Sequence, residues 1–200
     1  MEPHLGQLGW RLKHSLLALE ICGKLEPGGR LHSELRRLVT EAQVNPTLQQ
    51  KWLFYKEAIS ELLVGLPLFD RGCWDYFEDD AKARASYEQW VAGMVTEEGA
   101  RSEPSGDDPY RGSVRYLTFT MAFLLVNGSP TDLAVRRLCN VPEARLWERQ
   151  TFAQLLSGLG ILNFASIMSD VAYLIPRDVG WGLTLEDLAD PKFQYLRPIV

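Results

Sequence analysis

The pattern that most constrains the fold lies in the last third of the chain, where two apolar runs flank a helical segment. The run Tyr116–Val126 is rich in β-branched and aromatic residues, which predicts a strand. A helix is expected over Pro142–Gly158, and a second strand over Ala165–Ile175. A strand, a helix and a strand in this order predict two parallel strands joined by a right-handed crossover, if the strands are neighbours.

The first half of the chain carries apolar residues at helical spacing, which predicts helices and no strands. Thr47 follows Asn45-Pro46 and is a suitable N-cap, while Gly65 and Pro67 mark the end of the same helix. The four predicted helices span Leu5–Ile21, Leu31–Val44, Thr47–Gly65 and Trp74–Met94.

These elements predict an α+β protein in three parts. Residues 1–95 are expected to form a helical bundle, and residues 96–112, polar and rich in Gly and Pro, a linker. Residues 113–200 are expected to form a small strand–helix–strand unit. Short helices are predicted over Thr131–Cys139 and Thr184–Ala189, and the chain ends in an extended tail.

A two-stranded sheet is only marginally stable by itself, and both of its edges are unpaired. The helical region packing on one face, the tail from Phe193 adding a strand, or a second subunit would each supply what is missing. We expect the helical region to cover one face, and an edge to serve self-association or partner binding.

Composition excludes several classes of function. The net charge of -5 gives no overall positive field for nucleic acid or an anionic membrane. Neither long apolar stretch supplies the roughly 20 uninterrupted residues of a membrane-spanning helix, since Asn163 and Asp170 interrupt the second one. The N-terminus has no signal-peptide pattern, so a cytoplasmic protein is expected.

Motifs for catalysis or for binding a metal or cofactor are not found in the sequence, and none of these sites is predicted. The three cysteines form no CxxC pair, and the three histidines lack zinc-helix spacing. An acidic cluster is interpreted as a helix start favoured by the helix dipole, with cation binding as the alternative. The cysteines are Cys22, Cys73 and Cys139, the histidines are His4, His14 and His32, and the acidic cluster consists of Asp75, Glu78, Asp79 and Asp80.

Four residues near the end of the chain are predicted to contact a partner: Trp181, Phe193, Tyr195 and Arg197. Trp181 lies between two glycines on a loop after the second predicted strand. A tryptophan at such a place either fills a gap in its own core or presents an anchor to a partner, and both interpretations stay open.

Roughly the last 85 residues resemble an uncharacterised family of photosynthetic bacteria and chloroplasts, which includes the plant fluctuating-light acclimation protein. The resemblance rests on a strand ending in proline, a short acidic helix and a Leu-Arg-Pro ending. It implies a fold and no reaction, and this chain lacks the membrane-spanning and Gly-rich segments common in that family. The matching residues are Tyr116-Leu117-Thr118-Phe119-Thr120, Ser169–Pro176, Leu183–Leu188 and Tyr195-Leu196-Arg197-Pro198-Ile199.

Two functions are compatible with these observations. The first is a non-catalytic interaction or scaffold protein that acts through the sheet edge, Trp181 and the tail. The second is an enzyme or small-molecule-binding protein with a pocket between the helical half and the sheet. Such a pocket would bring polar groups and perturbed titrating residues together.

Overall fold

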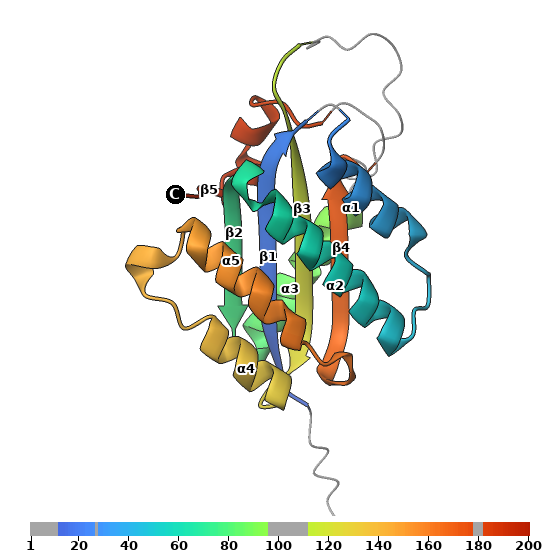
Figure 1. The fold of residues 1–200 in the computed structure, drawn as a ribbon. Helices are drawn as coiled ribbons and strands as arrows, with labels where there is room; N and C mark the ends of the chain where they lie inside the picture. Colours follow the sequence, from blue (N-terminus) through green and yellow to red (C-terminus); the bar gives the residue numbers. More distant parts are fainter. Residues whose placement is uncertain (1–11, 27, 96–111, 178–181) are drawn as a thin grey trace, which may run out of the picture.

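The computed structural model describes residues 12–26, 28–95, 112–177 and 182–200, and within them the chain forms a five-stranded antiparallel sheet (Figure 1). The strand order is β4-β3-β1-β2-β5, so β1 and β3 are central. The strands are β1 (His14–Leu25), β2 (Phe69–Phe77), β3 (Arg115–Val126), β4 (Ile167–Ile175) and β5 (Arg197–Pro198). The helices are α1 (Arg30–Glu41), α2 (Leu48–Gly65), α3 (Asp80–Val95), α4 (Pro130–Leu138) and α5 (Arg149–Gly158).

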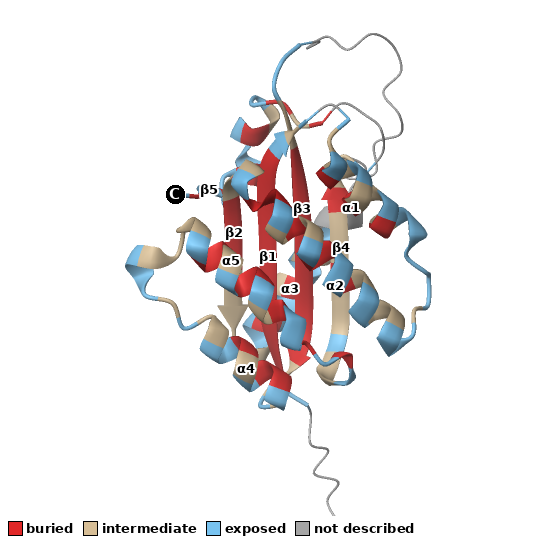
Figure 2. Ribbon diagram, in the orientation of Figure 1, coloured by how far each residue is buried: buried red, intermediate tan, exposed pale blue. Residues whose placement is uncertain are grey.

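The predicted N-terminal helical bundle is wrong, because helices alternate with strands from the beginning of the described chain. The predicted first helix overlaps β1, and the start of the predicted fourth helix overlaps β2. Strand β1 is buried on both faces over most of its length (Figure 2). A strand buried on both faces reads as a nearly continuous apolar run, which helical spacing also fits.

The predicted parallel pairing of the last two long strands is also wrong. Thr118 of β3 pairs with Ile175 of β4, and Leu125 pairs with Ile167, so the two strands are antiparallel. The connection contains two helices, as predicted: α4 nearly coincides with the expected short helix Thr131–Cys139, whereas α5 begins at Arg149 rather than at Pro142. Two helices carry the chain along the sheet and back, so β4 starts beside the end of β3.

Four helices cover one face of the sheet, and the sequence predicted α1, α2 and α4 closely. Helix α2 begins after Thr47, which forms a full capping box with Gln50, as the N-cap prediction required. Helix α1 lies within the predicted second helix except for its first residue. Helices α4 and α5 complete this face, and all four helices contribute to the main core around Leu19, Ile21 and Phe123. Within the described residues, no helix is both long and apolar enough to cross a bilayer.

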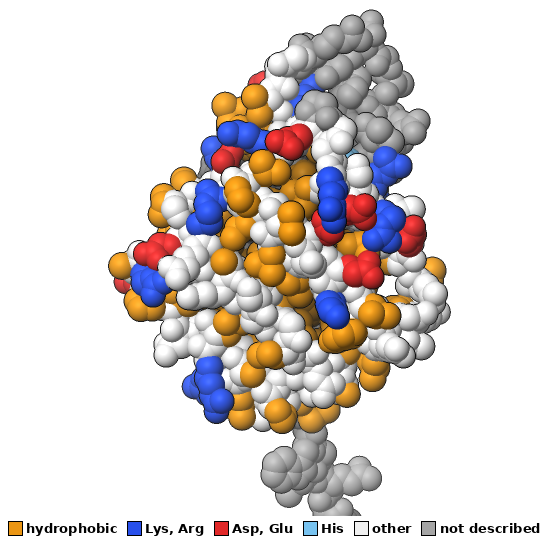
Figure 3. All heavy atoms as spheres, in the orientation of Figure 1, with side chains coloured by type: hydrophobic (Ala, Val, Ile, Leu, Met, Phe, Trp, Pro, Cys, Tyr) orange, Lys and Arg blue, Asp and Glu red, His pale blue; other side chains and the backbone are white. Residues whose placement is uncertain are grey.

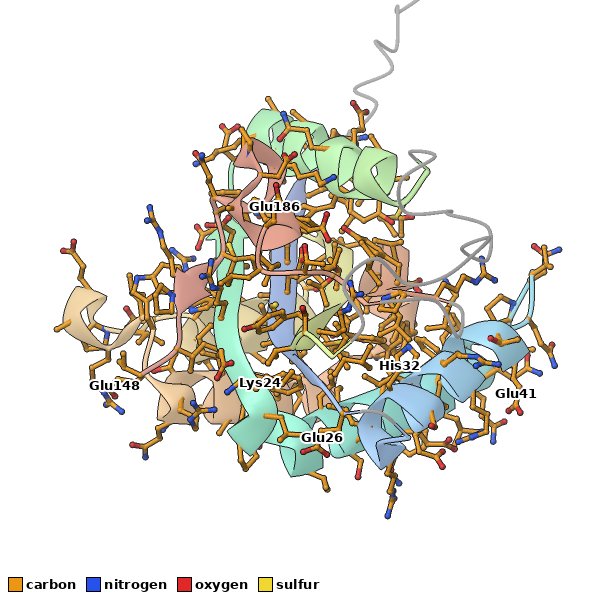
Figure 4. The ribbon with its side chains drawn as sticks, turned by 90° about the horizontal axis from the view of Figure 1, so that it is seen from above. Lys24, Glu26, His32, Glu41, Glu148 and Glu186 are labelled. Atoms are coloured by element: carbon orange, nitrogen blue, oxygen red, sulfur yellow. The ribbon has the colours of Figure 1, made fainter. Side chains whose placement is uncertain are left out.

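The opposite face of the sheet is covered by α3 and by residues 182–200, which we call the C-terminal segment. Figure 4 shows this arrangement from above: Glu186 of the segment lies beside α3, and His32 and Glu41 of α1 lie on the other side of the sheet. Leu188, Phe193 and Leu196 of the segment pack on Cys22 of β1 and Cys73 of β2. The segment therefore belongs to the folded core.

The C-terminal segment joins the sheet at two places. Leu183 exchanges two backbone hydrogen bonds of 2.8 Å with Tyr116, and β5 pairs with Arg71 and Gly72 of β2. The possibility that the tail adds a strand is thus confirmed, although it pairs with a strand that the sequence did not predict. The predicted cap at Thr184 is also present, because Thr184 and Asp187 exchange backbone-to-side-chain hydrogen bonds.

Candidate functional site

Strand β4 forms one edge of the sheet, and no described strand pairs with its outer side. Monomeric proteins protect such edges with lysine, proline or bulges, because an unpaired row of backbone N–H and C=O groups invites pairing. Strand β4 spans nine residues and contains no lysine, arginine, proline or glycine. Its single charged residue is Asp170. The register shift where β4 begins, opposite Leu124 and Leu125, leaves the rest of the strand regular.

A groove runs beside this edge, between β4 and the hairpin of α1 and α2. It has a volume of about 430 Å³, and its β4 wall consists of Asp170, Val171 and Ala172. Leu53 and Phe54 of α2 give it apolar surface, while the end of α1 supplies charge. Figure 3 shows charged side chains gathered over α1, to the right in that view. An extended segment laid along β4 would therefore meet both backbone groups and side chains.

Charges at the base of the groove neutralise one another. The Lys51 ammonium group of α2 forms an ion pair with the Asp170 carboxylate, and the Tyr55 hydroxyl donates to the same carboxylate at 3.1 Å. Burial, followed by the charge of Asp170, holds the pKa of Tyr55 well above its usual range. The Tyr55 ring stacks on Phe164 at 5.3 Å. This network fixes α2 to β4 and keeps the only charge of the edge strand compensated.

The α1 rim of the groove is acidic in balance. The Arg37 guanidinium group contacts three carboxylates: Glu34 at 3.0 Å, Glu41 at 2.9 Å and Glu57 at 3.3 Å. All four side chains are substantially exposed to solvent. One cation facing three anions leaves an excess of negative charge that a basic side chain of a ligand would complement.

Exposed apolar side chains also lie near the beginning of β4. Trp52 and Leu48 of α2 line a second hollow of about 370 Å³ together with Phe164. Trp52 is 40% exposed and Met168, at the start of β4, is 55% exposed. The Trp52 ring lies at the surface, under the Lys56 ammonium group. An exposed tryptophan beside a hollow is typical of binding hot spots.

A second polar feature lies on the other face of the sheet. Glu20, on the central strand β1, is 1% exposed, and its carboxyl group accepts a 2.8 Å hydrogen bond from the Tyr195 hydroxyl. Burial raises the pKa of Glu20 from 4.5 to about 7. The Thr118 and Thr120 hydroxyls of β3 are also buried, and within the described residues neither makes a hydrogen bond of good geometry. They still lie close enough to Glu20 to act against the rise of its pKa.

The predicted partner-contact residues have different environments. Phe193 is buried in the protein's own core, and Tyr195 is partly exposed while its hydroxyl reaches Glu20. Arg197 is exposed on β5. Trp181 lies outside the described residues, as do residues 96–111 of the expected linker. The structure thus brings Phe193 and Tyr195 to the Glu20 face, away from the groove beside β4.

Most of the remaining candidates have ordinary structural environments. Cys22 and Cys73 are buried free thiols, and burial raises the pKa of each to about 12. Asp80 lies in the first turn of α3, as the dipole interpretation expected, but Asp75 belongs to β2. In the described part of the chain, no group of three or more His, Cys, Asp or Glu residues is arranged to hold a metal ion.

Comparison with protein-family models, with curated proteins and with solved structures finds no match to this chain. The resemblance described from the sequence, and the two functions considered there, therefore remain predictions.

Sequence reasoning missed the groove because its parts are far apart in the chain. Asp170 was visible only as a polar interruption of an apolar run, and Lys51 as an ordinary helix residue. A lone acid within a strand is a usable signal, since a half-buried carboxylate requires a partner. Nothing in the sequence identified Lys51 as that partner.

Proposed function

We propose that this protein is a protein-binding module that accepts an extended segment of a partner along β4. The observation that supports this most strongly is an edge strand without lysine, proline or glycine, bordered by a groove of about 430 Å³. Strand addition of this kind draws affinity from main-chain hydrogen bonds and specificity from pockets for alternate side chains. The apolar surface around Trp52 and Met168 supplies such contacts at one end.

The charge of the rim favours a partner segment over a second copy of this chain. If two copies paired their β4 strands antiparallel, a two-fold axis would place both α1–α2 hairpins on the same side of the joined sheet. The rims around Arg37 would then bring together two surfaces in which carboxylates outnumber guanidinium groups. Like charges across an interface oppose association. We therefore infer a partner segment with apolar residues toward Trp52 and a lysine or arginine toward Glu41.

The groove also lies where the alternative function predicted a pocket, between helices and sheet. Its polar groups, however, are used within the protein, because Lys51 and Tyr55 both bind Asp170. A general base or nucleophile must be available to a substrate. The network is therefore better suited to holding the groove in shape than to chemistry.

Selection from a random library of short displayed peptides tests the proposal directly. We expect enriched peptides to slow hydrogen exchange at backbone amides of β4 and to carry a basic residue. The variant Met168→Lys places a charge on the edge strand and should reduce binding at least tenfold. Leu185→Lys, which changes an exposed leucine of the C-terminal segment in the same way, is the matched control.

Three results would contradict the proposal. The library yields no binding peptide, the enriched peptides protect amides elsewhere, or Met168→Lys and Leu185→Lys reduce binding equally. Sedimentation of the free protein as a dimer that Met168→Lys dissociates would instead show that a second copy occupies the edge.

A further inference from the structure

Glu20 is an uncompensated carboxyl group at the centre of the sheet. In the register it lies between Cys73 of β2 and Thr120 of β3, and Thr120 in turn pairs with Tyr173 of β4. None of these neighbours is a cation. The oxygen atoms around Glu20 are hydroxyls, and the Thr118 and Thr120 hydroxyls lack good hydrogen bonds of their own. A buried carboxylate without a cation is costly, so its surroundings favour the protonated form.

Two opposing effects act on this carboxyl group, and burial is the larger. The hydrogen bond from Tyr195 and the nearby Thr120 and Thr118 hydroxyls stabilise the charged form and lower the pKa. Burial raises it more strongly, so that the pKa reaches about 7. A state that lets water reach Glu20 would restore the ordinary value near 4.5. Such a state is therefore favoured as protons are removed.

The part of the C-terminal segment around Tyr195 is the cover of Glu20 with the least regular structure. The Tyr195 hydroxyl contacts the carboxyl group directly, while the residue is 39% exposed and its ring meets Trp90 of α3 edge-on at 5.7 Å. Helix α3, which covers the same face of the sheet, is a regular helix of 16 residues, whereas the segment around Tyr195 contains only 3-10 turns of three residues each. Moving this stretch would expose Glu20 and leave the pairing of β1 with β2 and β3 intact.

The thiols and tyrosines near Glu20 do not change charge close to neutral pH. Burial raises the pKa of Cys22, Cys73 and Tyr173 to about 12 each, and that of Tyr195 further still. Asp75 of β2 and Tyr87 of α3 also have raised pKa values. The charge of Arg71 acts against this rise at Cys22, and the charge of Arg197 does so at Cys73.

We propose that Glu20 is a proton-controlled latch: when this carboxyl group loses its proton, the C-terminal segment around Tyr195 opens from the sheet. At lower pH the neutral carboxyl group keeps the segment closed over Cys22 and Cys73. This device lies on the sheet face opposite the groove beside β4 and does not depend on the proposed binding function. The proposal gives a regulatory role to the Glu20 carboxyl group, which does not line the groove.

Hydrogen exchange measured as protection factors tests the latch, because the intrinsic effect of pH is divided out. Between about pH 5 and about pH 8 we expect the opening equilibrium of amides Leu188–Leu196 to rise roughly 100-fold, and by no more than about tenfold per pH unit. The amides of β1 and β3 should stay more protected than the segment throughout. Segment protection that does not change with pH, or that always equals that of β1, would overturn the proposal.

Variants identify the group responsible. Glu20→Gln removes the charge but keeps an acceptor for Tyr195, so the pH dependence of segment exchange should disappear. Glu88→Gln, on the exposed side of α3, is the matched control and should behave as the unmodified protein. Tyr195→Phe removes a contact that lowers the pKa of Glu20, so the midpoint of opening should move to higher pH. If Glu20→Gln retained the pH dependence, another group would control the segment and the proposal would fail.

Discussion

Asp170 and Glu20 are two carboxyl groups on the same sheet, and they are accommodated in opposite ways. Asp170 lies on the edge strand β4, where the long side chain of Lys51 reaches it from α2. Glu20 lies on the central strand β1, where its neighbours are the hydroxyls of other residues. At the edge a charge is compensated by a partner ion, whereas at the centre it is neutralised by a proton. The position of a strand within the sheet thus determines which solution is open to an acidic residue.

Glu20→Gln should have the largest effect on stability, and its sign should depend on pH. Between pH 4.5 and about 7 the folded protein retains the Glu20 proton that the unfolded chain releases, so stability falls as pH rises through this window. At about pH 8 the variant should be more stable by about 3 kcal/mol, since one pKa unit corresponds to about 1.4 kcal/mol. At about pH 5 the gain should be below about 1 kcal/mol. Urea unfolding at both pH values measures the difference, and an equal gain at both would contradict the assignment.

Asp170→Asn should lower the stability of the folded protein, in contrast to Glu20→Gln. It leaves the partly buried Lys51 ammonium group without its ion partner, which should destabilise the protein by about 2 kcal/mol at neutral pH. The double variant Lys51→Met/Asp170→Asn should recover much of this loss, because the remaining amide needs no cation. Urea unfolding of the two single variants and the double variant forms a complete cycle. Additive losses would show that the pair does not act as a unit.

Thr120→Val tests how much the unsatisfied hydroxyl beside Glu20 matters. The valine methyl group replaces a buried hydroxyl that has no good partner, so the free energy of unfolding should change by less than about 1 kcal/mol at about pH 5. The pKa of Glu20 should rise, since the Thr120 hydroxyl lowers it. Carbon NMR of the Glu20 carboxyl group measures that pKa directly. A lower pKa in the variant would contradict the arrangement described above.

Arg37→Gln should have the smallest effect, although Arg37 makes three ion pairs. All of its partners are exposed, and exposed ion pairs contribute about 0–1 kcal/mol. The expected loss is below about 0.5 kcal/mol, and added salt should reduce it further. Thermal unfolding at low and high salt measures this change. A loss as large as that of Asp170→Asn would mean that the rim, too, is structurally essential.

The elements that the sequence predicted well are those whose signals are local. Thr47 and Gln50 mark the start of α2 within four residues, and the aromatic and β-branched residues of β3 mark a strand. Strand β1 was mistaken for a helix because Leu16, Leu19 and their neighbours fit both periods when both faces of a strand are buried. Only its pairing with β3 decides between them, and that pairing is a long-range contact.

The candidate sites were harder to predict for the same reason. The sequence gives no sign that Glu20 is buried, because a glutamate within a helix-like pattern is ordinary. Its environment results from four strands and the C-terminal segment meeting at one point. The expectation of an unpaired sheet edge did not require knowledge of these long-range contacts. It was made for a sheet of two strands, whereas the sheet has five.

The pairing of β1 between β2 and β3 also bears on how the protein is made. Strand β1 is synthesised before both of its neighbours, and β3 follows only after β2 and α3. Until β3 is synthesised, the edge of β1 that will pair with β3 is unpaired, and its apolar side chains are exposed. Long-range strand pairing of this kind is slow, and chains with such exposed surface tend to aggregate and rely on chaperones. A fragment cut at residues 96–112 would preserve that exposed state permanently. Dissection of this protein should therefore proceed by point variants in the full chain rather than by separate halves.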